Sequence, residues 1–320
     1  MRQFFPGITV VLMLFLMSVL SGCGGSTSTS SSSPTAQVPI TSAPTATEMP
    51  EVETVTEEQP EDPEFALPEF DASAFDSTAE IDNKYFPMTP GMNYVFEGIT
   101  EEGGRQIPHS IVFTVTDLTK EIMGIRTVVA YIVDYSDGKL VEAEVAFYAQ
   151  DIHGNVWFMG EHPEVYEDGV MVEAPTWIPG FKGAQAGIVM KAQPELDQPS
   201  YAQGWGPAVN WTDRGRVVGM GEQTCVPVDC YEDVLITEEF SQSEPDAFQV
   251  KYYAPGVGNV RVGWRGEDAT HEELELTELT QLSDGDLAEI RDAALALEAH
   301  AYEISKEVYD RTKPSEYQSP

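Results

Sequence analysis

Two cysteines, Cys225 and Cys230, stand close enough in the sequence to react with each other. Four residues separate them, and one of these is Pro227, which favours a turn. Such a turn can bring two Cα atoms within the roughly 4.4–6.8 Å that a disulfide requires. We therefore predict a Cys225–Cys230 disulfide in a strand-turn-strand context. Because the closed loop is short, the bond should pin the turn more than it stabilises the whole domain.

A third cysteine, Cys23, follows an apolar stretch that is too short to span a membrane. The basic start, the apolar run and the small residues before Cys23 are typical of an export signal. The four residues from Leu20 to Cys23 read Leu-Ser-Gly-Cys and resemble the bacterial lipobox, in which the cysteine thiol receives a diacylglyceryl group and the chain is cut before it. We predict a signal peptide over residues 1–22 and a lipid on Cys23. The alternative is an ordinary secretory signal that leaves Cys23 as a free thiol.

The histidines and acids form no recognisable catalytic or metal-binding pattern. The five histidines are scattered, with no pair at the spacing of metal ligands on a helix. His153 lies in a turn and His162 precedes a proline, so we expect both in exposed loops. Asp151 and His153 suggest part of a triad, but no serine stands in a Gly-x-Ser-x-Gly elbow. We therefore predict no metal site, no cofactor and no catalytic residue.

Aromatic side chains are the remaining candidates for a binding site. Tryptophan is favoured at recognition sites because its large apolar ring carries one hydrogen-bond donor. Trp157, Phe158 and Tyr252 belong to segments that offer more apolar surface than one helix can cover. We predict an apolar cleft near Trp157 and Tyr252 that holds a hydrophobic ligand or a segment of a partner. Packing within the core is the alternative.

The charge of the chain excludes some classes of partner. The 54 acidic and 17 basic residues give a formal net charge of −37. Few cations are available to neutralise phosphates, which argues against nucleic acid and against a protein lying flat on anionic lipid. A hydrophobic content of 42% is sufficient for a folded core.

Residues 23–75 differ in composition from the rest of the chain. They are rich in Ser, Thr, Pro and Glu, and no Lys or Arg occurs between Gly24 and Glu80. Such a segment repels itself and cannot bury enough apolar surface to fold. We predict a disordered acidic tether that holds the folded part away from the membrane.

Residues 76–280 have the pattern of antiparallel β structure. Apolar residues alternate at Met92, Tyr94 and Phe96, whereas the run 128–133 is apolar at every position and predicts a strand covered on both faces. In the segment 141–147, apolar residues alternate with Glu142 and Glu144, which predicts one dry and one wet face. Turn signals such as Asp137-Gly138 separate the runs. We predict a mainly β domain, with a curved antiparallel sheet or a partial barrel or sandwich.

The C-terminal part changes to helical periodicity. Apolar residues recur at intervals of three and four between Leu287 and Val308, and Ser283 is a good N-cap residue. We predict one long amphipathic helix within residues 281–312 that packs on the sheet, followed by a disordered tail over residues 313–320.

Four short motifs resemble those of a family of bacterial exported β domains, many of them lipoproteins. The motifs begin at Tyr85 (YFPMTPG), Tyr148 (YAQD, continuing to Glu161), Gly187 (GIVM) and Tyr253 (YAPGVG). The resemblance implies a curved, mainly antiparallel sheet, and it brings no established activity or catalytic residue. The cysteine pair departs from the family pattern.

Together these features predict an extracytoplasmic protein attached to a cell membrane by its lipid. We expect a non-catalytic binding or scaffold module of the cell envelope, with a hydrophobic ligand or an envelope protein as its partner. The alternative is an extracytoplasmic hydrolase whose site is assembled from distant loops. A pocket with convergent titratable groups would favour the hydrolase.

Overall fold

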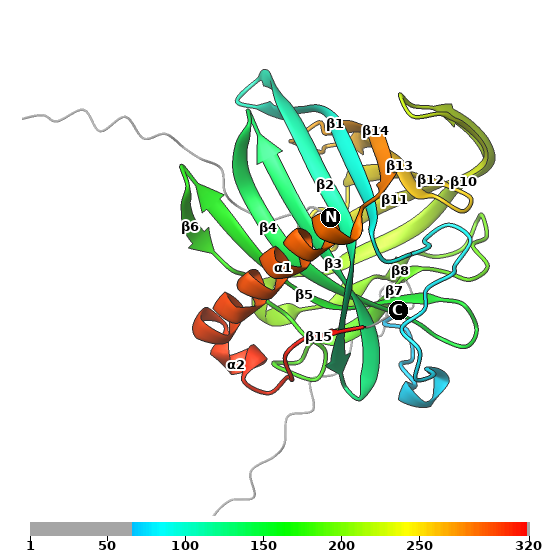
Figure 1. Ribbon diagram of the computed structural model, residues 1–320. Coiled ribbons are helices and arrows are strands. Elements are labelled where there is room, and N and C mark those ends of the chain that lie inside the picture. The colour runs from blue at the N-terminus through cyan, green and yellow to red at the C-terminus, as the bar shows by residue number, and fades with distance from the viewer. Residues whose placement is uncertain (1–65, 319–320) are drawn as a thin grey trace, which may run out of the picture. The chain divides into compact units, whose positions relative to one another are not determined.

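The structure is a computed structural model that describes residues 66–318 (Figure 1). Its strands are β1 (Met92–Glu102), β2 (Arg105–Ile122), β3 (Ile125–Ser136), β4 (Lys139–Gln150), β5 (Val156–Glu167), β6 (Val170–Glu173), β7 (Gln185–Met190), β8 (Tyr201–Ala202), β9 (Gly204–Trp205), β10 (Asp213–Cys225), β11 (Cys230–Ser241), β12 (Ala247–Ala254), β13 (Gly258–Gly266), β14 (Glu273–Gln281) and β15 (Glu316–Tyr317). The helices are the short 3-10 turns η2 (Ala72–Ala74) and η3 (Pro207–Val209), then α1 (Asp284–Ile304) and α2 (Lys306–Tyr309).

The strands form one antiparallel sheet that nearly closes on itself. Its order is β8-β10-β11-β12-β13-β14-β1-β2-β3-β4-β5-β7-β9, with β6 paired to β5 and β15 paired to β2. Gln203 alone separates β8 from β9, so the two ends of this order belong to one segment of chain. The mainly β, barrel-like fold and its C-terminal helix confirm the predicted fold class. We call the space that the sheet encloses the lumen.

Most neighbouring strands are joined by tight hairpins, and turn residues in the sequence predict them. Asp137 and Gly138, between β3 and β4, both have positive φ angles, 49° and 71°. Two central residues with φ > 0 give a turn whose twist matches that of the flanking strands, and Asp-Gly is a preferred pair for it. The register of these hairpins is therefore set by local chemistry.

Apolar side chains gather in two cores, one on each face of the sheet. Strand β3 contributes to both, because Val128, Ala130 and Ile132 face the lumen whereas Val129 faces outward. This confirms the prediction that residues 128–133 are covered on both sides. The outer core lies under α1.

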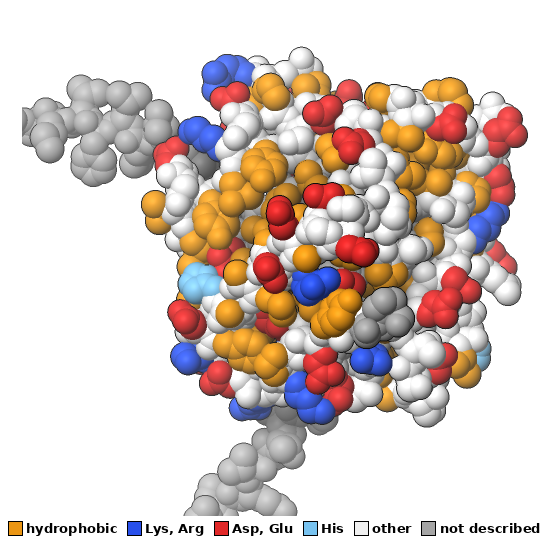
Figure 2. All heavy atoms as spheres, in the orientation of Figure 1, with side chains coloured by type: hydrophobic (Ala, Val, Ile, Leu, Met, Phe, Trp, Pro, Cys, Tyr) orange, Lys and Arg blue, Asp and Glu red, His pale blue; other side chains and the backbone are white. Residues whose placement is uncertain are grey.

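Helix α1 covers the outer core by crossing β2 and β4 (Figure 1). Ser283 caps its first turn by accepting a hydrogen bond from the backbone N–H of Asp286. Ala294, Leu297 and Ala301 are buried against the sheet, and Val308 of α2 extends the same contact. Figure 2 shows acidic side chains spread among apolar ones over this side of the molecule. No helix within residues 66–318 is long and apolar enough to cross a membrane.

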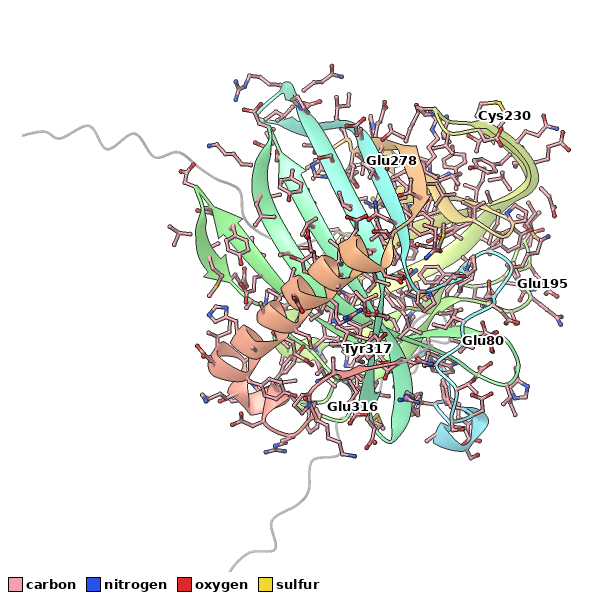
Figure 3. All side chains as sticks on the ribbon, viewed as in Figure 1. Glu80, Glu195, Cys230, Glu278, Glu316 and Tyr317 are labelled. Carbon is pink, nitrogen blue, oxygen red and sulfur yellow. A yellow bond between two sulfur atoms is a disulfide. The ribbon has the colours of Figure 1, made fainter. Side chains whose placement is uncertain are left out.

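Both ends of the described chain contact strands of the sheet. The tether was expected to reach residue 75, but Phe70 and Phe75 pack against Trp157, with ring centroids 5.3 and 6.0 Å away. The tail from residue 313 was expected to be disordered, yet Glu316 and Tyr317 form β15 on the edge of β2 (Figure 3). These residues contact strands that are distant from them in the sequence.

Closure of the sheet depends on glycines at the seam between β7 and β9. A Cβ atom at Gly187 would lie 2.3 Å from the backbone nitrogen of Gly204, which no real side chain tolerates. Gly204 and Gly206 are in turn covered by the indole rings of Trp177 and Trp211. The GIVM motif therefore begins with the residue that allows two backbones to approach closely.

Candidate functional site

A cavity of about 90 Å³ opens into the lumen on the side formed by β1, β2 and β12–β14. Its wall is mostly apolar, with aromatic rings from β1, β2 and the segment before β1, and its polar groups come mainly from β12–β14. The lining residues are Phe86, Pro87, Met88, Tyr94, Phe96, Ile111, Phe113, Gln249, Lys251, Tyr253, Val257, Gly258, Asn259, Val262, Glu272 and Leu274. An apolar concave wall with a few polar groups is the usual form of a small-molecule site.

Two of the sequence motifs meet at this cavity. The motif beginning at Tyr85 supplies Phe86 to the wall, and the motif beginning at Tyr253 supplies Val257. A backbone hydrogen bond of 2.7 Å from Gly256 to the carbonyl of Lys84 ties the two segments together. The hydroxyl of Tyr94 donates to the carbonyl oxygen of Val257 at 3.0 Å. Motifs that are far apart in the sequence thus build one wall of one cavity.

The ring of Phe86 connects this wall to the rest of the lumen. Its centroid lies 5.4 Å from the ring of Tyr148 and 6.4 Å from that of Tyr253. Tyr148 begins the motif that leads into β5, and it stacks on Phe158 at 5.0 Å. The aromatic interior therefore continues behind the cavity.

Buried charged and amide side chains form the polar end of the cavity. The Lys251 ammonium pairs with Glu239, and the hydroxyl of Tyr253 donates to the same carboxylate at 3.1 Å. Gln249 donates its side-chain N–H to Glu272. His109 Nε2 lies 3.0 Å from the other oxygen of Glu272 and 3.3 Å from Asp134 Oδ1.

Further along the lumen, carboxyl groups outnumber cations. Glu144 and Glu161 are both buried, and burial raises the pKa of each. Repulsion from Glu144 adds to burial in holding the pKa of Glu161 well above its usual value. Burial also raises the pKa of Asp213 to about 7. These groups can hold protons at a pH where exposed acids do not.

Glu144 corrects one prediction made from alternation. The face of β4 that carries Glu142 and Glu144 was expected to be wet, but Glu144 is only 1% exposed. It lies opposite Ile132 of β3, and Ile132 faces the lumen. Sheet closure turns what would be the solvent face of an open sheet into an interior.

A second polar cluster lies on the outer side of β5, under the helices. His162 Nδ1 lies 2.6 Å from Thr176 Oγ1, and His162 Nε2 lies 3.3 Å from Glu164 Oε1. Glu164 also contacts His300 of α1 at 2.6 Å, and Thr176 contacts Ser305 at 2.8 Å. The hydroxyl, imidazole and carboxylate of Thr176, His162 and Glu164 have the order of a triad, but all three residues are buried. Because Glu164 and Thr176 contact His300 and Ser305, the cluster fastens the end of α1 to the sheet.

His162 was predicted in an exposed loop, and this is wrong. It lies within β5 and is completely buried. Burial alone raises the pKa of Glu164, but hydrogen bonds from His162, Tyr166 and His300 outweigh it and lower that pKa to about 2. The carboxylate is therefore ionised wherever the protein is folded near neutral pH.

The three predicted aromatic site residues do not line the cavity. Trp157 is 4% exposed in the outer core, where its Nε1 donates to Asp151 Oδ2 at 2.8 Å. Phe158 is buried in the lumen core, and Tyr252 packs under the guanidinium of Arg261, 5.5 Å from the ring centroid. The cavity uses the neighbouring Tyr253 instead.

Sequence reasoning missed the cavity residues of β12 because alternation there points to the opposite face. Phe248, Val250 and Tyr252 are the apolar set, so alternation alone assigns them to the core-facing side. The lumen instead receives the other set, Gln249 and Lys251 among them. The Tyr85 and Tyr253 motifs are the sequence features that belong to this site, but the sequence does not show that they meet.

The predicted disulfide is confirmed, with an S–S distance of 2.04 Å between Cys225 and Cys230. It joins paired residues at the tip of the long β10–β11 hairpin, where Figure 3 labels Cys230. Cys23, the predicted lipid site, lies outside the described residues.

No protein-family model matches the chain, and no curated protein matches its sequence. Among solved structures it is similar to a Bacteroides fragilis protein inferred to be exported, with a YmcC-like fold. That match has 15% identity, a TM-score of 0.33 and coverage of 62% of this chain and 99% of the other. It is also similar to an inferred lipoprotein of Parabacteroides distasonis, with 13% identity, a TM-score of 0.33 and the same coverage. A TM-score at this level supports no conclusion about the present chain.

Proposed function

We propose that this chain is a lipid-anchored extracytoplasmic binding protein that holds a small, largely apolar ligand in its lumen cavity. The observation that carries the proposal is the cavity itself, whose apolar and aromatic wall ends in a few buried polar groups. Such a wall gains free energy by removing apolar ligand surface from water, whereas the polar groups orient the ligand.

The size of the cavity limits the ligand to few heavy atoms. At about 90 Å³ it is smaller than the roughly 300–1,000 Å³ of drug-sized sites. An apolar cavity of about 150 Å³ is known to bind benzene. The cavity here is smaller than that, so a ligand of at most one ring, or a short branched chain, is the size class that we propose.

The proposed location rests on the N-terminal sequence. The Leu-Ser-Gly-Cys pattern at Cys23 supports lipid attachment, and the acidic segment that follows supports a spacer between the anchor and residue 66. The disulfide supports an oxidising compartment, where such bonds persist. The membrane, through the lipid, is the partner that these features support.

Toluene is a suitable probe for the proposed site because it carries a single ring, the upper size limit proposed, and no polar group. We expect ligand-observed NMR to detect toluene binding to the full chain. Val262 lines the cavity, so Val262→Phe should fill it and weaken binding at least tenfold. Val250 does not line the cavity, and Val250→Phe on the neighbouring strand is the matched control.

A thermal melt of each variant separates a filled cavity from a misfolded protein. Loss of toluene binding in a Val262→Phe protein that melts cooperatively supports the cavity as the site. Equal binding by wild type and Val262→Phe, or no binding by the wild type, would contradict the proposal. Turnover of a substrate at this cavity would instead favour the hydrolase.

A further inference from the structure

Four hydrogen-bond donors at the cavity wall already have partners within the protein. Lys251 donates to Glu239, and Gln249 donates to Glu272. The hydroxyls of Tyr253 and Tyr94 donate to Glu239 and to the carbonyl of Val257. A ligand that brings only acceptors would have to compete with one of these bonds or bind to the side-chain N–H of Asn259 alone.

One acceptor at the wall has no donor among residues 66–318. The side-chain oxygen Oδ1 of Asn259 is buried and makes no hydrogen bond within that part of the chain. Asn259 lies at the start of β13, opposite Tyr253, and it lines the cavity. Leaving a buried acceptor unpaired costs free energy, so such an atom calls for a donor from outside the described residues.

The charges at the polar end of the cavity also favour a ligand that brings a hydrogen-bond donor. Two carboxylates, Glu239 and Glu272, stand against the single ammonium of Lys251, and Asp134 lies behind Glu272 next to His109. An anion entering here would meet like charges, or would displace Glu239 from Lys251 and leave a buried carboxylate unpaired. A cation is not repelled by these carboxylates and does not need to displace Glu239 from Lys251.

The remaining wall suits the body of an organic cation. Phe86, Tyr94, Phe96 and Phe113 present aromatic rings to the cavity. Aromatic faces attract cations as well as apolar groups, and the attraction is stronger where water is excluded.

We propose that the ligand of this cavity is a small primary amine, with its ammonium group donating to Asn259 Oδ1 and its apolar body against the aromatic wall. This inference rests on the proposed function, because it names the chemical class of ligand for the same cavity. It excludes carboxylates of the same size.

Three ligands that share one ring test the proposal. Benzylamine carries an ammonium, benzoate carries a carboxylate, and toluene carries neither. The protein is the full chain with Cys23→Ser, so that no detergent competes for the cavity. NMR titration should give benzylamine an affinity about tenfold or more above that of toluene, since hydrogen bonds to charged groups are the strong ones. Benzoate should bind more weakly than toluene.

Two substitutions at Asn259 change the acceptor in opposite directions. Asn259→Leu removes it and should lower benzylamine affinity about tenfold while leaving toluene affinity within about twofold. Asn259→Asp adds a negative charge and should raise benzylamine affinity, an increase that misfolding would not produce. We therefore expect the two substitutions to change benzylamine affinity in opposite directions and to leave toluene affinity nearly unchanged.

The outcomes distinguish this inference from the proposed function. If toluene binds but benzylamine binds no better, water satisfies Asn259 and the inference is wrong, whereas the cavity remains a binding site. Tighter binding of benzoate would overturn the inference in the same way. If none of the three ligands binds, both proposals fail.

Discussion

The indole nitrogen Nε1 of Trp177 donates a hydrogen bond of 3.0 Å to Glu161 Oε1 inside the lumen. Glu161 is buried beside Glu144, so a charged pair there would face both desolvation and repulsion. The hydrogen bond from the indole offsets only part of the free-energy cost of desolvation and repulsion. Burial and repulsion therefore favour a protonated form of the pair, and this makes the stability of the fold depend on pH.

Replacing Glu161 by Gln should stabilise the protein at neutral pH. An unfolded glutamate releases its proton near pH 4.5, whereas burial holds the pKa of folded Glu161 well above that value. The folded state then binds more protons, so stability is full below pH 4.5 and falls as pH rises toward the folded pKa. Glutamine needs no proton and still accepts from Trp177. Glu161→Gln should raise the melting temperature at pH 7 by about 2–4 °C per kcal/mol gained, and it should bring no gain at pH 4.

Exposed Glu97 on β1 provides the control for this pH dependence. Glu97→Gln should shift the melting temperature little at either pH, because an exposed carboxyl loses no hydration on folding. A Glu161→Gln protein that melts below wild type at pH 7 would show that the carboxyl pair is not strained.

The buried ion pair between Lys120 and Glu298 should hold α1 on the sheet. Lys120 Nζ lies 2.7 Å from Glu298 Oε1 and donates to the carbonyl of Lys313 at 2.6 Å. Burial lowers the pKa of Lys120, which shows that its charge is costly there without a partner. Glu298→Ala leaves that charge uncompensated and should cost about 3–5 kcal/mol in urea unfolding.

A double variant and a surface pair test this reading of the ion pair. Lys120→Met combined with Glu298→Leu should recover most of the lost stability, since no charge is then buried. Lys313 pairs with Glu121 at the exposed surface, and Lys313→Ala should cost less than about 1 kcal/mol. A double variant as unstable as Glu298→Ala would mean that the loss came from packing.

Gly187→Ala should destabilise the sheet at its seam. The added Cβ would meet the backbone of Gln203 and Gly204 at 2.4 and 2.3 Å, and backbone atoms cannot move aside without breaking the β7–β9 pairing. We expect a loss of about 1–3 kcal/mol or more by urea unfolding. Gly263 on β13 has no atom within 4 Å of its Cβ position, so Gly263→Ala should stay within about 0.5 kcal/mol of wild type. Equal effects of the two substitutions would contradict closure at this seam.

Cys23→Ser should remove the lipid and release the protein from the membrane. The serine hydroxyl does not replace the thiol that the lipobox pattern modifies, so the variant should appear in the soluble fraction or as an unprocessed precursor. Cell fractionation followed by mass spectrometry of the N-terminus measures both. The double variant Cys225→Ser with Cys230→Ser keeps Cys23 and should remain at the membrane. A membrane-bound, normally processed Cys23→Ser protein would contradict lipid anchoring.

The local elements of this fold could be predicted from the sequence because their causes are local. Alternation at Met92, Tyr94 and Phe96 predicts β1, and Asp137-Gly138 predicts the turn after β3. Ser283 and the apolar stripe that follows it predict α1 and its N-cap. Each signal acts within a few residues, because neighbouring residues determine the local hydrogen bonds and the direction of each side chain.

The candidate site could not be predicted in the same way, because it depends on which faces the closed sheet encloses. Lys251 and Glu144 look like solvent-facing residues in their strands, and closure places both in the lumen. The Tyr85 and Tyr253 motifs meet only because β12–β14 pair next to β1. Burial of a polar residue is decided by partners far along the chain, and single-strand periodicity carries no information about them. The sequence thus determined strands, turns, the helix and the disulfide pairing, whereas the tertiary structure alone decided which side chains form the cavity.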